Sequence, residues 1–244
     1  MSFSPNFFLS LGAVATAVLG GIYFLKEWRM HRGLKTALFW AMGFFGIFLF
    51  QVPTILFNAR VDFALSRFGL FFSLALPVSF LSLICVYCGI VSLTRNIRKI
   101  EYVMFGLWLA ACLAFFNYYF YQHQAFTTHA PLYAMILIFF LPIHLANLWA
   151  LSAFHATNRF EKDARYDLGI IALLLGGACG IARNMLFLYG FESHAPQFWF
   201  LALQPESLFW FQMLGTAFFL FGFYFIHQKM KGIIAGHRIQ GTNP

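Results

Sequence analysis

Seven stretches of about 20 apolar residues with few charges dominate the sequence and constrain the fold more than any other feature. They lie near 5–25, 37–58, 70–93, 102–121, 132–154, 167–190 and 200–226. As an α-helix, a stretch of this length spans the hydrocarbon core of a bilayer. Because the stretches are apolar on all faces and do not alternate in polarity, they indicate helices and not the strands of a β-barrel.

The composition excludes an ordinary soluble domain. Of 244 residues, 61% are hydrophobic and 10% are charged, against roughly 25% charged in a typical soluble protein. So few charges cannot cover a water-exposed surface of this size. The sequence therefore predicts an all-α integral membrane protein, a seven-transmembrane-helix bundle formed by one domain over residues 1–230. Residues 231–244 are expected to form a short cytoplasmic tail.

The distribution of lysine and arginine predicts the orientation. The connections after the first, third and fifth stretches, together with the C-terminal tail, carry 13 of the 16 basic residues. These are Lys26, Arg29, Arg32, Lys35, Arg95, Arg98, Lys99, Arg159, Lys162, Arg165, Lys229, Lys231 and Arg238. The positive-inside rule places them in the cytoplasm and the N-terminus outside, in a multi-pass protein of a bacterial inner (plasma) membrane.

The same basic residues explain the net charge of +8. Because they lie in short connections beside the membrane, their expected partners are anionic lipid headgroups at the cytoplasmic face and not nucleic acid. The four cysteines lie in apolar stretches, and His31, His155 and His227 lack a metal-binding spacing. Catalytic motifs are also missing, so we expect no metal, no cofactor and no catalytic residue, and an enzyme is not favoured.

A period of about 65 residues links the last six stretches. Gln51, Asn117 and Asn184 are 66 and 67 residues apart, and Pro77, Pro142 and Pro205 are 65 and 63 residues apart. This spacing indicates one helix followed by three related helical hairpins, each with a proline kink in its second helix. The alternative is that prolines and small amides are simply common in transmembrane helices.

Two opposite charges lie at matched depth in the last two stretches. Arg183 and Glu206 are each about 9–10 Å from the outer end of their stretch, at 1.5 Å per residue. Apart from Asp167 at the first position of its stretch, Glu206 is the only acidic residue within the stretches bounded above. Charges in lipid are expected to pair, so Arg183 and Glu206 are predicted to face each other. The predicted ligand-binding residues around this pair are Arg183, Glu206, Gln51, Asn117, Asn184, Gln204 and His144. The alternative is a purely structural ion pair.

The layout of seven short-looped helices resembles microbial rhodopsins, SWEET-type sugar transporters and the seven-helix sensor regions of bacterial histidine kinases. Gln51, Pro77 and Asn117 are similar to polar and proline positions of those sensor regions, although residues 231–244 are too few for a kinase domain. The resemblance is architectural and implies no functional residue.

The expected function is a receptor or sensor that binds a small anionic or carbonyl-bearing ligand in an outward-facing polar pocket, with a cytoplasmic or membrane protein as a further partner. One alternative is a small-solute transporter, for which prolines within helices and internal repeats are typical. Another is a membrane subunit or enzyme that acts on lipid or quinone.

Overall fold

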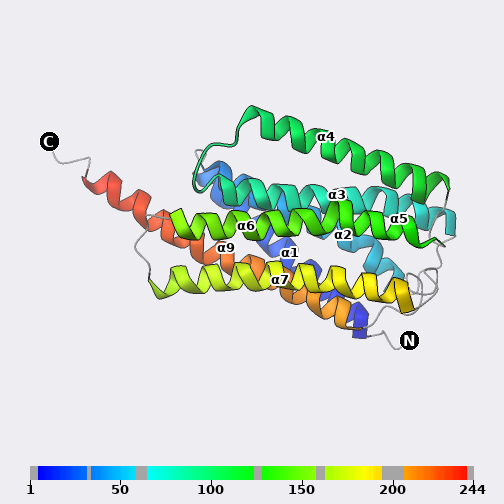
Figure 1. Ribbon diagram of the computed structural model, residues 1–244. Coiled ribbons are helices and arrows are strands. Elements are labelled where there is room, and N and C mark those ends of the chain that lie inside the picture. Colours follow the sequence, from blue (N-terminus) through cyan, green and yellow to red (C-terminus); the bar gives the residue numbers. More distant parts are fainter. Residues whose placement is uncertain are drawn as a thin grey trace.

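The computed structural model describes residues 5–31, 34–58, 65–123, 128–157, 163–193 and 206–240, and the regular secondary structure of these residues is entirely helical (Figure 1). The elements are α1 (Pro5–Met30), α2 (Lys35–Asn58), α3 (Leu65–Val91), α4 (Lys99–Phe116), η1 (Asn117–Gln122), α5 (His129–Ala134), η2 (Met135–Phe140), α6 (Leu141–Thr157), α7 (Ala164–Ser193) and α9 (Glu206–Gln240). η1 and η2 are π-helices that continue α4 and connect α5 to α6.

Seven helical spans of the described residues are long and apolar enough to cross a membrane, which confirms that part of the sequence prediction. Each span also presents large apolar side chains to the exterior; Leu19 of α1, Leu107 of α4 and Trp149 of α6 are 64%, 68% and 69% exposed. Water disfavours such continuous apolar surface, whereas lipid tails accept it. The arrangement indicates a multi-pass membrane protein.

Six of the seven spans form a closed ring. α1 packs on α2, α2 on α3, α3 on α6, α6 on α7, α7 on α9, and α9 packs back on α1. α4 stands outside this ring and packs mainly on α3, at the edge of the bundle in Figure 1. Aromatic rings also join α4 to η2, since the centroids of Phe115 and Phe139 are 5.4 Å apart. Most residues of α4 therefore face the surroundings, whereas Cys112 and Phe116 are buried against the bundle. The other six spans share an interior.

Small residues bring α7 and α9 into close contact. A Cβ atom on Gly222 of α9 would lie 2.9 Å from the carbonyl oxygen of Gly169 on α7 and would also meet Leu173. Gly176 and Gly215 make a second close approach, with 3.5 Å between a Cβ atom on Gly215 and the carbonyl oxygen of Gly176. Membrane helices pack closely where small residues let their backbones approach. This contact fixes α9 against α7.

The prolines occupy different settings. Pro77 lies inside α3, whereas Pro142 is the second residue of α6 and follows the π-helix η2 directly. A proline lacks the backbone N–H that an α-helix uses, and a π-helical segment is one way in which a helix adjusts its hydrogen bonding. Pro205 lies outside the described residues. The kinks at all three prolines and the relation among the three hairpins stay predictions.

Polar contacts concentrate at one end of the bundle, which we call the basic end and which carries Arg95, Asp163 and Lys229. Arg95 donates two hydrogen bonds to the Glu101 carboxylate, at 2.7 and 2.5 Å. Lys229 Nζ lies 2.7 Å from Asp163 Oδ2, and this pair joins the start of α7 to α9. Hydrogen bonds from Lys229 and from the backbone N–H of Tyr166 hold the pKa of Asp163 below its usual range. The pair therefore stabilises the fold at pH values above the usual pKa range of an aspartate. This contribution is lost as the pH falls through the lowered pKa of Asp163.

Exposed tyrosines mark the opposite end. Tyr118, Tyr119 and Tyr121 of η1 are 51%, 36% and 46% exposed. Amphipathic aromatic rings favour the boundary between lipid and water, where the ring contacts acyl chains and the hydroxyl contacts water. The two ends of α4 and η1 thus match the two faces of a bilayer, with the basic residues Arg98 and Lys99 at one face and the tyrosines at the other.

Candidate functional site

A polar cavity lies within the ring of six helices. Its volume is about 60 Å³, and five of the six spans contribute to its wall. Its polar lining consists of Ser79 and Ser82 of α3, His144 of α6, Arg183 of α7, and Gln212 and Thr216 of α9. Ile47 of α2 and the phenylalanines Phe140, Phe211 and Phe219 supply the apolar part. Polar side chains from four separate spans therefore converge on one small space.

Two buried polar atoms of the cavity wall lack a partner in the described part of the chain. Ser82 is 1% exposed and His144 is 8% exposed, and Ser82 Oγ and His144 Nδ1 make no hydrogen bond there. Thr216 differs, because its hydroxyl donates to the carbonyl oxygen of Gln212 at 2.8 Å. A buried polar group without a partner costs about 1–3 kcal/mol. The cavity therefore favours an occupant that can form hydrogen bonds with Ser82 and His144.

Arg183 brings a positive charge to the same space. The guanidinium carbon lies 5.4 Å from the ring centroid of Phe50 and 5.0 Å from that of Phe187, distances that suit cation–π contacts. None of the described residues that line the cavity is acidic. The two rings orient the guanidinium without neutralising it, so its donors remain suited to an anion.

Contacts with α7 and a hydrogen bond from Asn147 to α3 fix the position of His144. Its imidazole lies against Gly180 of α7, where an added Cβ atom would collide with the ring. One turn further along α6, the amide of Asn147 donates to the carbonyl oxygen of Leu83 at 3.2 Å and to that of Ile143 at 2.9 Å. The first of these bonds ties α6 to α3 beside Ser82. The glycine and the asparagine together hold His144 at the cavity wall.

The volume limits the occupant. About 60 Å³ holds roughly four to six water molecules at about 10–15 Å³ each. Binding sites for larger organic ligands are usually about 300–1,000 Å³. In this conformation the cavity is suited to water, to a small ion or to a ligand of a few atoms.

The predicted Arg183–Glu206 ion pair is wrong for the described structure. The ion pairs among the described residues do not include one between Arg183 and Glu206, and Glu206 is exposed. The prediction assumed a helix that begins near residue 200, whereas α9 is described from Glu206. A carboxylate in the first turn of a helix is favoured by the helix dipole, so Glu206 does not require a buried cation.

The other predicted ligand-binding residues lie in different places. Only His144 joins Arg183 in the wall of the cavity. Gln51 and Asn184 are buried, at 1% and 5% exposure, but do not line it. Asn117 is exposed on η1, where its side-chain oxygen accepts a hydrogen bond from Gln122 at 3.1 Å. Gln204 lies outside the described residues. The roles of these residues in ligand binding stay predictions.

Four polar residues of the cavity were not among the predicted site residues, namely Ser79, Ser82, Gln212 and Thr216. The spacing of these residues in the sequence indicates which of them share a helix face. Ser79 and Ser82 are three residues apart and Gln212 and Thr216 are four apart, so each pair shares one face of its helix. Small polar side chains are frequent in membrane helices, and sequence alone does not distinguish a shared polar interior from isolated packing residues.

Comparison of the chain with protein-family models, with curated proteins and with solved structures finds no match.

Proposed function

We propose that this chain is a receptor or sensor-like membrane protein that binds a small anion in the central cavity. The observation that supports the proposal is the Arg183 guanidinium, with no acidic side chain among the described residues of the cavity wall, beside Ser82 Oγ and His144 Nδ1, which lack a partner in the same part of the chain. A buried charge without a counter-charge is unfavourable in a membrane interior. An anion that accepts hydrogen bonds from Arg183 and Ser82 satisfies both groups at once.

A monocarboxylate of one or two carbons is the ligand class that fits best. Its two oxygens match the forked donors of a guanidinium, and its size matches a cavity of about 60 Å³. The phenylalanines in the wall accept a methyl group, whereas Gln212 and Ser79 offer further hydrogen bonds. A larger anion requires the ring of helices to open.

Acetate and acetamide provide a matched pair of probes because they share a shape and differ in charge. Binding to the folded protein raises its stability by RT ln(1 + [L]/Kd), which is about 2.7 kcal/mol at 100 times the dissociation constant. We expect acetate to raise the unfolding temperature of the purified protein in a saturable way and acetamide to have no such effect. Equal responses to the two compounds, or no response to acetate, contradict the proposal.

The proposal includes the orientation, with the basic end in the cytoplasm of a bacterial cell and the opposite end outside. Its support is the excess of lysine and arginine at the basic end and the positive-inside rule. Ala130 and Asn96 are exposed at opposite ends of the bundle, and the four native cysteines are buried. On intact cells we expect an impermeant thiol reagent to label Ala130→Cys and to leave Asn96→Cys unlabelled. The reverse pattern contradicts the orientation.

A transporter is the second candidate, and one feature favours it. The π-helix η2 and Pro142 lie immediately before His144, so the helix is irregular where it enters the cavity. Irregular helices at the membrane midplane are typical of transporter binding sites. Transport predicts saturable uptake of labelled acetate into proteoliposomes at alkaline pH, where passive permeation of the protonated acid is suppressed. A receptor binds acetate without uptake.

A further inference from the structure

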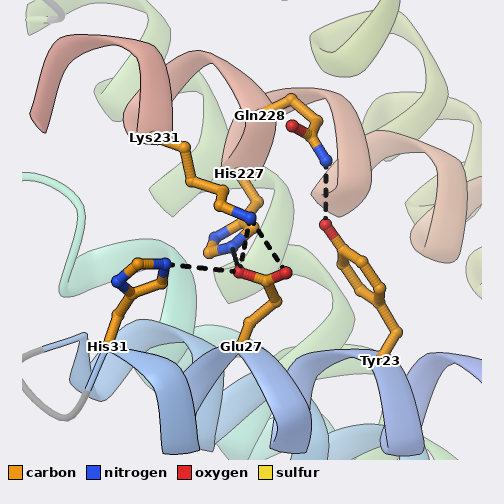
Figure 2. Close-up of polar contacts among 6 residues, drawn as sticks. All are labelled: Tyr23, Glu27, His31, His227, Gln228 and Lys231. Carbon is orange, nitrogen blue, oxygen red and sulfur yellow. Dashed lines mark hydrogen bonds and ion pairs between the residues drawn. The ribbon is translucent and has the colours of Figure 1, made fainter. Parts of the chain in front are cut away.

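A second cluster of ionisable side chains joins α1 to α9 at the basic end, and Figure 2 shows its members. The Glu27 carboxylate of α1 forms hydrogen bonds with two side chains of α9, His227 through Nε2 at 3.0 Å and Lys231 through Nζ at 2.9 Å. His31 is one turn after Glu27 on α1, and its Nε2 lies 3.9 Å from Glu27 Oε2. Beside this cluster, Gln228 donates to the Tyr23 hydroxyl at 3.1 Å. One buried carboxylate thus faces three nitrogen bases.

Exposure within the cluster is graded. The side chains of His227 and Glu27 are 1% and 6% exposed, whereas those of Lys231 and His31 are 30% and 36% exposed. The buried pair is therefore screened from water, and the two outer groups reach the surface at the basic end. His31 offers protons from solvent a short route to the carboxylate.

An aromatic layer separates this cluster from the central cavity. On α9 the residues Gln212, Thr216, Phe219, Phe223 and His227 recur at helical spacing and share one face. Gln212 and Thr216 line the cavity, and His227 belongs to the cluster, about 16 Å further along the helix at 1.5 Å per residue. The rings of Phe219 and Phe223 stack between them, with centroids 5.9 Å apart. The two polar sites are therefore distinct.

Trp40 of α2 closes the cluster on the third side. Its ring stacks on Phe223 at 4.4 Å and meets the His227 ring edge-on at 6.5 Å. The titratable groups that face Glu27 and His227 in the described structure are His31 and Tyr23 from α1 and Lys231 from α9. Tyr224 of α9 contacts the Tyr23 ring instead. The contact from α2 is aromatic and carries no charge.

The charges in this cluster balance in one protonation state. Glu27 ionised and Lys231 protonated sum to zero, provided that His227 and His31 are neutral. A carboxylate only accepts hydrogen bonds, so the nitrogen of neutral His227 that faces Glu27 carries the proton. A further proton on His227 adds a positive charge beside Lys231, one turn away on the same helix. Two cations then compete for one carboxylate.

We propose that the Glu27–His227 pair is a proton-binding site in which an incoming proton displaces the Lys231 ammonium. The proton adds to the imidazole nitrogen that does not face Glu27, and the Nε2–H bond to the carboxylate remains. Lys231 is long and partly exposed, so its ammonium moves into water and the buried charge stays balanced. Proton uptake thereby releases one of the links between α1 and α9.

Titration of the His227 ring nitrogens tests this site. The histidine ring nitrogens of the full chain are followed by ¹⁵N NMR in lipid nanodiscs without added anion, and His227 is assigned by residue-specific correlation. We expect Lys231→Gln to raise the midpoint pH of His227 by about one unit or more, because it removes a competing cation. Glu27→Gln is expected to lower the midpoint by a similar amount.

Lys229→Gln is the matched control, because Lys229 is two residues from Lys231 and pairs with Asp163 instead of Glu27. It should leave the midpoint of His227 unchanged. The proposal is overturned if Lys231→Gln and Lys229→Gln give the same midpoint as the unaltered chain, or if His227 takes up no proton before the fold is lost. Acetate is absent throughout, so failure here leaves anion binding in the central cavity untouched, and the converse also holds.

Discussion

Replacing Arg183 with glutamine is expected to lower the affinity of the protein for acetate by on the order of 100-fold. Truncating one partner of a buried, hydrogen-bonded charge pair costs about 2–5 kcal/mol, and each 1.4 kcal/mol is about a factor of ten. Isothermal titration calorimetry in detergent or nanodiscs measures the change directly. Glutamine keeps a polar side chain at the cavity but is shorter than arginine and lacks its charge and its forked donors.

Two further arginine variants make this prediction specific. Arg29 is exposed at the basic end of α1, and Arg29→Gln changes the net charge by the same amount without touching the cavity. It should bind acetate as the unaltered chain does. Arg183→Lys keeps the charge but loses the stacking on Phe50 and Phe187 and the fork, so we expect intermediate affinity. Unchanged binding by Arg183→Gln contradicts the assigned site.

The largest expected effect on stability is at Gly222, where we predict that alanine destabilises the fold by about 1–3 kcal/mol. The added Cβ atom would lie 2.9 Å from the carbonyl oxygen of Gly169, which is backbone and cannot move without separating α7 from α9. The unfolding temperature in detergent, or the denaturant midpoint, measures the change.

Gly106 of α4 provides the control for Gly222. A Cβ atom on Gly106 would meet nothing within 4 Å, because α4 stands outside the ring. Since alanine is favoured over glycine in a helix by about 1 kcal/mol, Gly106→Ala should leave the protein as stable as before or more stable. Equal destabilisation by both substitutions is incompatible with the close α7–α9 contact described above.

The apolar stretches predicted the spans because lipid imposes length and polarity on each helix separately. Helix ends were harder to predict. The charges of Lys26, Glu27 and Arg29 interrupt the first stretch, so its predicted end was residue 25, whereas α1 continues to Met30. Glu27 remains in the helix because Lys231 balances its charge and His227 forms a hydrogen bond with its carboxylate. Those partners lie some 200 residues away in the sequence, and no local pattern identifies them.

The candidate site was only partly predicted, again because it depends on contacts between segments that are distant in the sequence. Arg183 and His144 stand out as ionisable residues in apolar stretches, and the structure brings both to one cavity. Asn117 has the same side chain as Asn184, yet Asn117 is exposed and Asn184 is buried, because α4 lies outside the ring. The packing order of helices depends on contacts between distant segments, and every stretch here is apolar on all sides. The sequence identified the ionisable residues of the apolar stretches, whereas the direction in which a side chain points could not be read from it.

Anomalous X-ray scattering from crystals soaked in bromide tests the central claim most directly, because it locates a small anion without assuming its affinity. The account predicts a bromide peak inside the ring of helices, between the Arg183 guanidinium and the side chains of Ser82 and His144, and no peak there in Arg183→Gln crystals. Bromide found only at the basic end or on the surface, with the cavity empty of anomalous signal, contradicts the claim that this cavity binds anions.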